Sequence, residues 1–89
     1  MIRIDNRSLR QARTFKALAH PVRVRLLRRL LERDCCVHDA EKCLGISQPN
    51  VSQHLRVLRL AGIIAGERKK TRICYRIADE RVRYILKIM

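Results

Sequence analysis

A glycine turn between two short helical patterns constrains the fold of this chain more than any other feature. Residues 36–44 are expected to form a helix, which ends in a tight turn where Gly45 is free to take the left-handed conformation. Ser47 is a good N-cap for another helix over residues 48–61, and Pro49 is tolerated in the first turn of that helix. Two helices joined by so short a turn are typical of a helix-turn-helix.

Two helical patterns precede this unit. Residues 9–19 have few helix breakers and a thin apolar stripe, so they are expected to form a helix that stops at His20. Pro21 is well placed to begin the next helix, because the N–H that proline lacks has no helical partner there. This helix is expected to run to about Arg33, with leucines on one face and arginines on the other.

The hydrophobic pattern changes after Gly62. Alternation predicts two short strands at residues 63–66 and 71–77, joined by a charged hairpin tip at residues 67–70. Asp79 then opens a last helix, whose apolar residues recur at helical spacing. This order of elements (α-α-α-α-β-β-α) predicts a mainly α winged helix-turn-helix with a small β-hairpin.

The length of 89 residues fits one domain, residues 1–89. So short a chain buries a small core, which disfavours an enzyme with a substrate cleft and makes self-association an expectation. No apolar run approaches the ~18 residues of a membrane span, and the first residues lack the apolar centre of a signal peptide. We therefore expect a soluble cytoplasmic protein with no membrane partner and with reduced cysteines.

The charge balance indicates a polyanionic partner. The chain has 21 Lys and Arg against 8 Asp and Glu, a formal net charge of +13. Such an excess suits DNA, RNA or an anionic membrane. Proteins that bind single strands usually stack bases on aromatic rings, and this chain has only one Phe, two Tyr and no Trp, which favours double-stranded DNA.

Several stretches resemble the ArsR/SmtB family of small dimeric repressors. They are residues 15–23 (FKALAHPVR), residues 44–58 (LGISQPNVSQHLRVL), residues 61–64 (AGII) and residues 75–79 (YRIAD). The resemblance covers about residues 12–86. It implies a homodimer built on the first and last helices, which binds an inverted-repeat operator and releases that operator when an inducer binds.

Candidate DNA contacts lie on the helix over residues 48–61 and on the hairpin. If Val51, Leu55 and Leu58 face inward, the helical period turns a polar face outward, and Gln, Asn, Ser and Arg can all bond base edges. The predicted contacts are Gln48, Pro49, Asn50, Ser52, Gln53, His54 and Arg56, with Arg68, Lys69, Lys70 and Arg72 on the hairpin. Among these, His54 is expected to pack or to face phosphate. The alternatives are a solvated polar face and an ordinary charged turn.

The resemblance also implies an inducer site at the start of the helix over residues 36–44. The matching residues are Cys35, Cys36, His38 and Asp39, which suit zinc-like ions, cadmium or arsenite. Within a regular helix, however, Cys36 and His38 point nearly opposite ways, so one complete four-ligand site does not follow. The family's metal site on the last helix is not matched: Asp79 is present, but Arg81 stands where the resemblance would require a histidine ligand.

Other interpretations remain open. The cysteines could instead form a thiol-redox switch at Cys35 or Cys36, although no resolving cysteine is evident, or they could be inert, with Cys43 and Cys74 packing in the fold. A non-specific architectural protein would use the same basic surface without reading bases. A Cys/His enzyme is disfavoured, because no orienting group or oxyanion pocket is visible.

Overall fold

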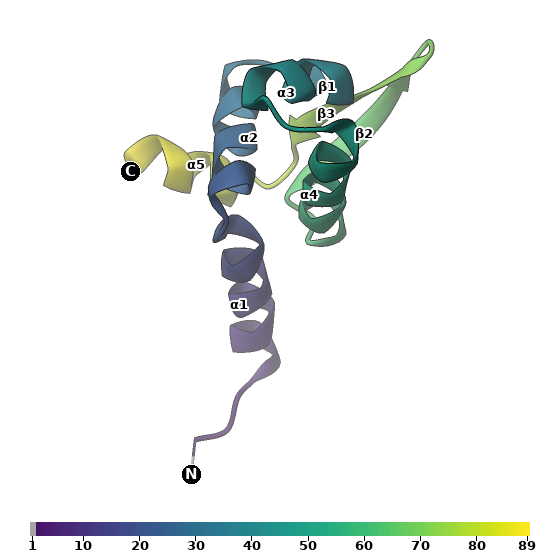
Figure 1. Ribbon diagram of the computed structural model, residues 1–89. Helices are drawn as coiled ribbons and strands as arrows, with labels where there is room; N and C mark the ends of the chain where they lie inside the picture. Colours follow the sequence, from purple (N-terminus) through teal and green to yellow (C-terminus); the bar gives the residue numbers. More distant parts are fainter. Residues whose placement is uncertain (1) are drawn as a thin grey trace.

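Helices make up most of the structure, and a hairpin projects from them (Figure 1). The computed structural model describes residues 2–89. The elements are α1 (Asn6–Leu18), α2 (Pro21–Glu32), β1 (Cys35–Cys36), α3 (Val37–Leu44), α4 (Gln48–Leu60), β2 (Ile64–Lys69), β3 (Arg72–Ile77) and α5 (Glu80–Ile88). The predicted order is confirmed, with β1 as an addition, and the fold is a winged helix-turn-helix.

Helix α1 begins earlier than its apolar pattern predicts, and its N-terminal half extends away from the body (Figure 1). The Asp5 carboxylate accepts a hydrogen bond from the Ser8 N–H at 3.0 Å, so Asp5 is the N-cap. The predicted start at residue 9 was three residues late, because the first turn carries no apolar stripe. Ala17 is the buried residue of α1.

The helix-turn-helix unit is formed by α3 and α4. Gly45 ends α3 in the left-handed conformation with φ 68°, and its N–H donates to the Glu41 carbonyl at 2.9 Å. The predicted start of α3 at residue 36 was one residue early, because Cys36 is extended and pairs in a strand. Ser47 occupies the N-cap position of α4, but its side chain makes no capping hydrogen bond.

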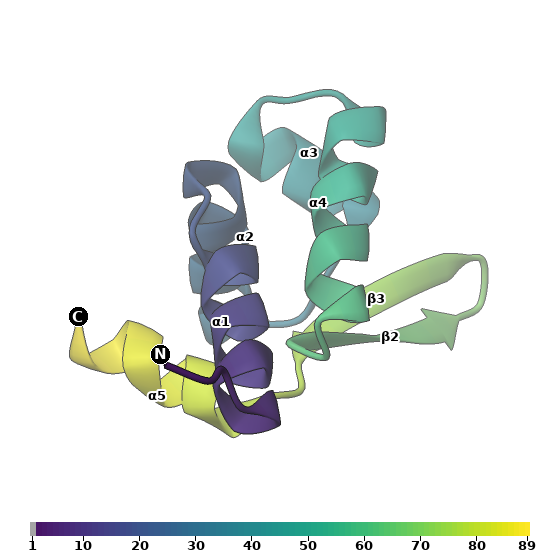
Figure 2. The same ribbon diagram turned by 90° about the horizontal axis from the view of Figure 1, so that it is seen from below.

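The three strands form an antiparallel sheet in the order β1-β3-β2. The predicted hairpin tip at residues 67–70 was misplaced: β2 continues to Lys69 and pairs there with Arg72, so the turn is Lys70 and Thr71. Lys70 takes φ 57°, a conformation that favours glycine or asparagine. The wing, defined as β2, β3 and this turn, leaves the body beside the C-terminal end of α4 (Figure 2).

The core lies where α2, α4 and the sheet meet. Its largest fully buried side chains come from α2, α4 and α5 and from the residue before β2. They are Leu26, Leu27, Leu30, Val51, Leu58, Ile63 and Val82. Helix α1 adds little to this core, and Phe15 on α1 and Tyr84 on α5 are 59% and 66% exposed. Among residues 2–89, no helix combines the length and the apolar character that a membrane crossing requires.

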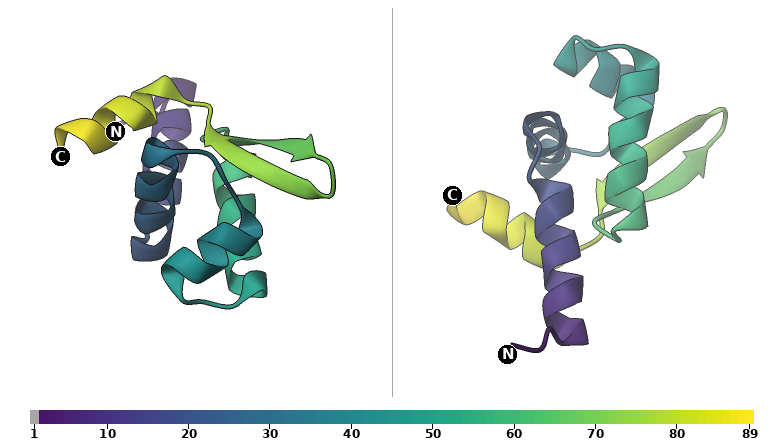
Figure 3. Two further views of the ribbon diagram at one scale, coloured as in Figure 1. Left: turned by 90° about the horizontal axis from the view of Figure 1, so that it is seen from above. Right: turned by 60° about the horizontal axis from the view of Figure 1, so that its bottom comes forward.

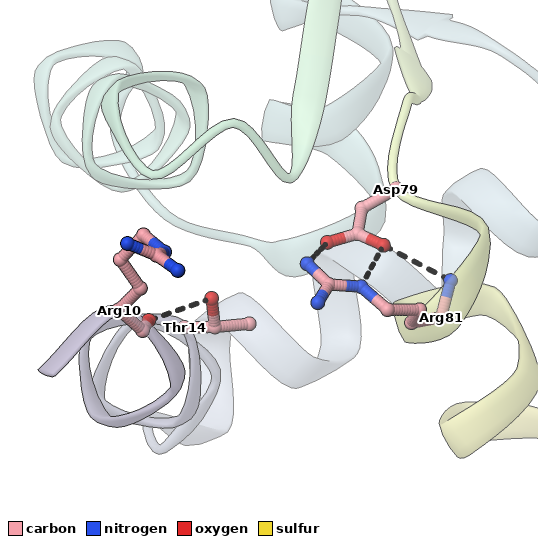
Figure 4. A network of polar contacts seen from close by, with 4 residues as sticks. All are labelled: Arg10, Thr14, Asp79 and Arg81. Carbon is pink, nitrogen blue, oxygen red and sulfur yellow. Dashed lines mark hydrogen bonds and ion pairs between the residues drawn. The ribbon is translucent and has the colours of Figure 1, made fainter. Parts of the chain in front are cut away.

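Helix α5 is anchored at its start by Asp79 (Figure 4). The Asp79 carboxylate accepts a hydrogen bond from the Arg81 N–H at 3.0 Å, which confirms Asp79 as the opening residue of this helix. The Arg81 guanidinium donates to both carboxylate oxygens, at 3.0 and 2.7 Å. The pKa of Asp79 is lowered, mainly by the hydrogen bond from the Arg81 side chain and further by the charge of Arg81.

Candidate nucleic-acid interface

The outer face of α4 is polar and open. Val51, Leu55 and Leu58 are buried, as predicted, which turns the opposite face of the helix toward solvent. The exposed residues on that face are Gln48, Pro49, Asn50, Ser52, Gln53 and Arg56. Amide, hydroxyl and guanidinium groups at this spacing can bond the edges of bases in a major groove.

The first turn of α4 also offers backbone donors. Because the Ser47 side chain leaves this turn uncapped, the N–H groups of Gln48 and Asn50 have no partner in the cap, and Pro49 has no N–H to satisfy. An uncapped helix start carries a partial positive charge that favours an anion such as phosphate.

His54 lies between the polar face and the core, and it contacts α2 instead of standing free. The His54 and His20 rings lie 4.4 Å apart between centroids. The Arg23 Nη1 lies 3.3 Å from His54 Nδ1, and since a guanidinium can only donate, Nδ1 is the acceptor. Burial, together with the His20 and Arg23 charges, lowers the pKa of His54.

Arg23 is a structural residue that sequence reasoning missed. The sequence pattern placed the arginines of α2 only on the face opposite the leucines, yet the Arg23 Nε donates to the Ala17 carbonyl at 2.6 Å. Its guanidinium therefore joins the last turn of α1 to α2 and to His54 on α4. No local signal marks this arginine among its neighbours, because its partners are distant in the chain or on the backbone.

The wing carries the second group of candidate contacts. Arg68, Lys69, Lys70 and Arg72 are all exposed. Lys69 and Arg72 are directly opposite each other in the β2–β3 register, and like charges at such a position repel. A phosphate between these two cations would relieve that repulsion. The wing projects from the body beyond α4 (Figure 3).

The four candidate inducer residues do not converge. Cys35 and Cys36 are 3% and 4% exposed, but they follow one another in a strand, and Cys35 belongs to the core cluster. The Cys36 thiol donates to an Asp39 carboxylate oxygen at 3.3 Å. His38 is exposed on α3, with its Nδ1 4.0 Å from a Glu41 oxygen. Within residues 2–89, no three His, Cys, Asp or Glu side chains gather as a metal-binding group.

The environments of the four thiols differ. Burial raises the pKa of the Cys35 thiol to about 11, which makes it a poor nucleophile. The hydrogen bond from Cys36 lowers the pKa of Asp39, and the charge of Arg72 lowers it further. Cys43 accepts a hydrogen bond from the Arg25 guanidinium at 3.3 Å. Cys74 lies on β3 directly opposite Cys36, a pairing that depends on the unpredicted strand β1.

Known proteins share this architecture. The model of the bacterial regulatory protein arsR family matches residues 20–65. The HTH-type transcriptional repressor SmtB of Mycobacterium tuberculosis is 42% identical over 71 residues, which are 80% of this chain and 53% of that protein. The chain thus spans about half the length of that relative.

Solved structures extend the similarity to nearly the whole chain. The crystal structure of M. tuberculosis Rv0081 has a TM-score of 0.86 and 36% identity, covering 96% of this chain and 86% of that one. The homodimeric winged helix-turn-helix DNA-binding domain of Mb0332 from Mycobacterium bovis, a possible ArsR-family transcriptional regulator, has a TM-score of 0.85 and 28% identity. That similarity covers 99% of this chain and 85% of that domain.

Proposed function

The chain belongs to the ArsR family of bacterial regulatory proteins, and from that premise we propose that it is a homodimeric repressor that binds an inverted-repeat operator in double-stranded DNA. The family is one of DNA-binding transcriptional regulators and not of enzymes. A homodimer places two copies of α4 about a two-fold axis, and two-fold symmetry in the protein calls for an inverted repeat in the DNA.

The observation that carries this proposal is the exposed polar face of α4. Gln48, Asn50 and Gln53 each offer an amide that can bond adenine at two positions, while Ser52 and Arg56 extend the same face. All five side chains are exposed, so a base edge can reach them without displacing the core. A non-specific architectural protein needs cationic side chains for the phosphates but no side chains that bond base edges.

The wing is proposed to hold the phosphate backbone. Arg68, Lys69, Lys70 and Arg72 supply charge without base recognition, which positions a protein on DNA without specifying the sequence. Two candidates on α4 remain, Pro49 and His54. They would contact the phosphate backbone of the DNA or pack within the protein. For His54, the contacts with His20 and Arg23 support a packing role.

The inducer is proposed to be a thiol-reactive compound whose reaction changes the chemical state of the Cys36 sulfur. A zinc-like ion takes four ligands, whereas Cys36 and Asp39 supply two, with Cys35 in the core and His38 on the exposed side of α3. The residues present therefore do not fit a zinc-like or cadmium site within one chain. Cys36 begins α3, the first helix of the helix-turn-helix, so a change at its sulfur would be transmitted to α4.

Fluorescence anisotropy tests the proposed function directly. The reduced protein is titrated with the duplex upstream of its own gene and, in parallel, with a scrambled duplex of equal length and composition. The affinity of a specific repressor for its operator is at least about 10³-fold higher than its affinity for other DNA. Equal affinity for the two duplexes at several salt concentrations would contradict specific recognition and favour the architectural protein.

A further inference from the structure

We propose that Cys36 and Cys74 form an intramolecular disulfide when the protein meets a hydroperoxide, so that β1 and β3 become covalently joined. This pairing deepens the proposed inducer chemistry at Cys36 and rests on the proposed function only for its effect on DNA. The thiol chemistry itself is a property of the free protein and is tested there.

The sheet register carries the inference. Cys36 and Cys74 are direct partners in the antiparallel β1–β3 pair, and both are free thiols. Directly opposed residues in such a pair have Cα atoms about 4.5 to 5.5 Å apart and side chains on the same face. A disulfide needs a Cα separation of about 4.4 to 6.8 Å, so the bond requires no large backbone movement.

The neighbouring cysteines are excluded by the same geometry. Successive residues of a strand point to opposite faces, so Cys35 lies on the face away from Cys36 and Cys74, where it packs in the core opposite Tyr75. Its raised pKa further lowers its reactivity. Cys43 lies on α3 with the Arg25 guanidinium at its sulfur, outside the strand pair.

Exposure sets the order of the two steps. Cys74 is half-buried, whereas Cys36 is 4% exposed, so the hydroperoxide reaches Cys74 first. The Cys74 thiolate attacks the outer peroxide oxygen, the O–O bond breaks, and the alcohol or water leaves after taking up a proton. Cys74 is then a sulfenic acid, oxidised by two electrons, and the peroxide has been reduced.

The second step closes the bond. The Cys36 sulfur attacks the Cys74 sulfur, an S–S bond forms, the S–O bond breaks, and hydroxide leaves and combines with the proton that Cys36 releases. Asp39 fixes the Cys36 thiol by accepting its hydrogen bond at 3.3 Å. Arg72 stands two residues before Cys74 on β3 and therefore on the same face, near the Asp39 carboxylate.

Thiol titration after a stoichiometric dose of hydrogen peroxide tests the proposal, using the full chain without DNA. The unfolded, quenched protein is expected to lose two of its four free thiols with a mass decrease of two hydrogens, and dithiothreitol is expected to restore both. Proteolysis is expected to yield one linked pair of peptides, which contain Cys36 and Cys74.

Single serine variants identify the pair. C36S and C74S are each expected to abolish the mass decrease, whereas C35S and C43S, the matched controls, are expected to retain it. Circular dichroism of each reduced variant shows whether it folds, and C74A supplies a second test if C74S does not. A disulfide to Cys35 or Cys43, a link between two chains only, or a gain of oxygen without loss of hydrogen would overturn the proposal.

Operator titration of the reduced protein, set beside the mass measurement, separates this inference from the proposed function. If reduced protein fails to prefer the operator duplex, the proposed repressor is wrong whatever the thiols do. If the mass decrease is absent in protein that prefers the operator, the disulfide is wrong and the repressor is retained.

Discussion

The His20 and His54 rings lie 4.4 Å apart and connect the N-cap of α2 to the proposed recognition helix α4. His20 also caps α2, because its Nδ1 accepts a hydrogen bond from the Val22 N–H at 3.1 Å. Arg23 lies against His54 from α2 as well. A proton added to His54 would remove the acceptor for Arg23 and place a second positive charge beside that guanidinium.

This contact predicts that acid destabilises the protein through His54. The pKa of His54 is lowered in the fold by burial first and then by the charges of His20 and Arg23, so the unfolded chain binds this proton more readily. The free energy of unfolding should therefore fall as pH drops below about 6.5 and stop falling below the folded pKa. Urea denaturation from about pH 7 to about pH 5 should show a shallower fall for His54→Gln than for the wild type. His38→Gln, at an exposed histidine, is the control, and equal slopes for all three proteins would rule out His54 as the cause.

Replacing Arg23 should weaken the junction of α1, α2 and α4. Arg23→Gln removes the guanidinium bonds to the Ala17 carbonyl and to His54, and we expect a loss of about 1–3 kcal/mol in the free energy of unfolding. Arg28→Gln makes the same charge change on the exposed face of α2 and should stay within about 0.5 kcal/mol of wild type. Chemical denaturation measures both, and a similar small loss in the two variants would contradict the structural role of Arg23.

The helix-turn-helix was predictable because its signals are local. Gly45 fixes the turn, and the apolar spacing of Val51, Leu55 and Leu58 alone determines which side of α4 is polar. The exposed polar face that holds the candidate base contacts was therefore predicted without any tertiary information. The wing was found in outline, but its turn was misplaced, because four consecutive charged residues give no alternation to mark where a strand ends.

Strand β1 was not predictable, because two residues cannot show a period. It exists because β3 offers an unpaired edge to Cys35 and Cys36. This one element changed the interpretation of the cysteines. As strand residues, Cys35 and Cys36 face opposite sides of the sheet, and Cys36 faces Cys74, 38 residues further along the chain. Contacts between residues so far apart in sequence leave no local pattern.

Base recognition by α4 predicts a loss of sequence preference in Gln53→Ala. Gln53 is exposed on the outer face of α4, and an amide that bonds a base there contributes about 1–3 kcal/mol of discrimination. The ratio of affinities for operator and scrambled duplexes should therefore fall by that amount, while affinity for scrambled DNA changes little. Arg59→Ala, near the C-terminal end of α4, serves as a control. An equal loss of affinity for both duplexes would show that Gln53 contacts the phosphate backbone and not a base.

Phosphate contact by the wing predicts a different signature in Lys70→Gly. Glycine accepts the φ of 57° at this position without strain, so the change removes charge and leaves the turn intact. The slope of log affinity against log salt should become shallower by about 0.9, the value for one phosphate contact, with the sequence preference retained. Salt titrations on both duplexes measure the slope, and an unchanged slope would remove Lys70 from the set of contacts.

Dimerisation through α1 and α5 predicts that a charge at Phe15 separates the two chains. Phe15 is 59% exposed and Tyr84 66%, so these rings contribute little to the core of one chain and suit burial against a second copy. Phe15→Glu should shift sedimentation from dimer toward monomer at micromolar concentration. Leu86 is a less suitable site for this test, because it packs partly against the core and a charge there would also destabilise the fold. Ile73→Glu, at an exposed apolar residue of the wing, is the control, and a dimer undisturbed by Phe15→Glu would move the interface away from this face of α1.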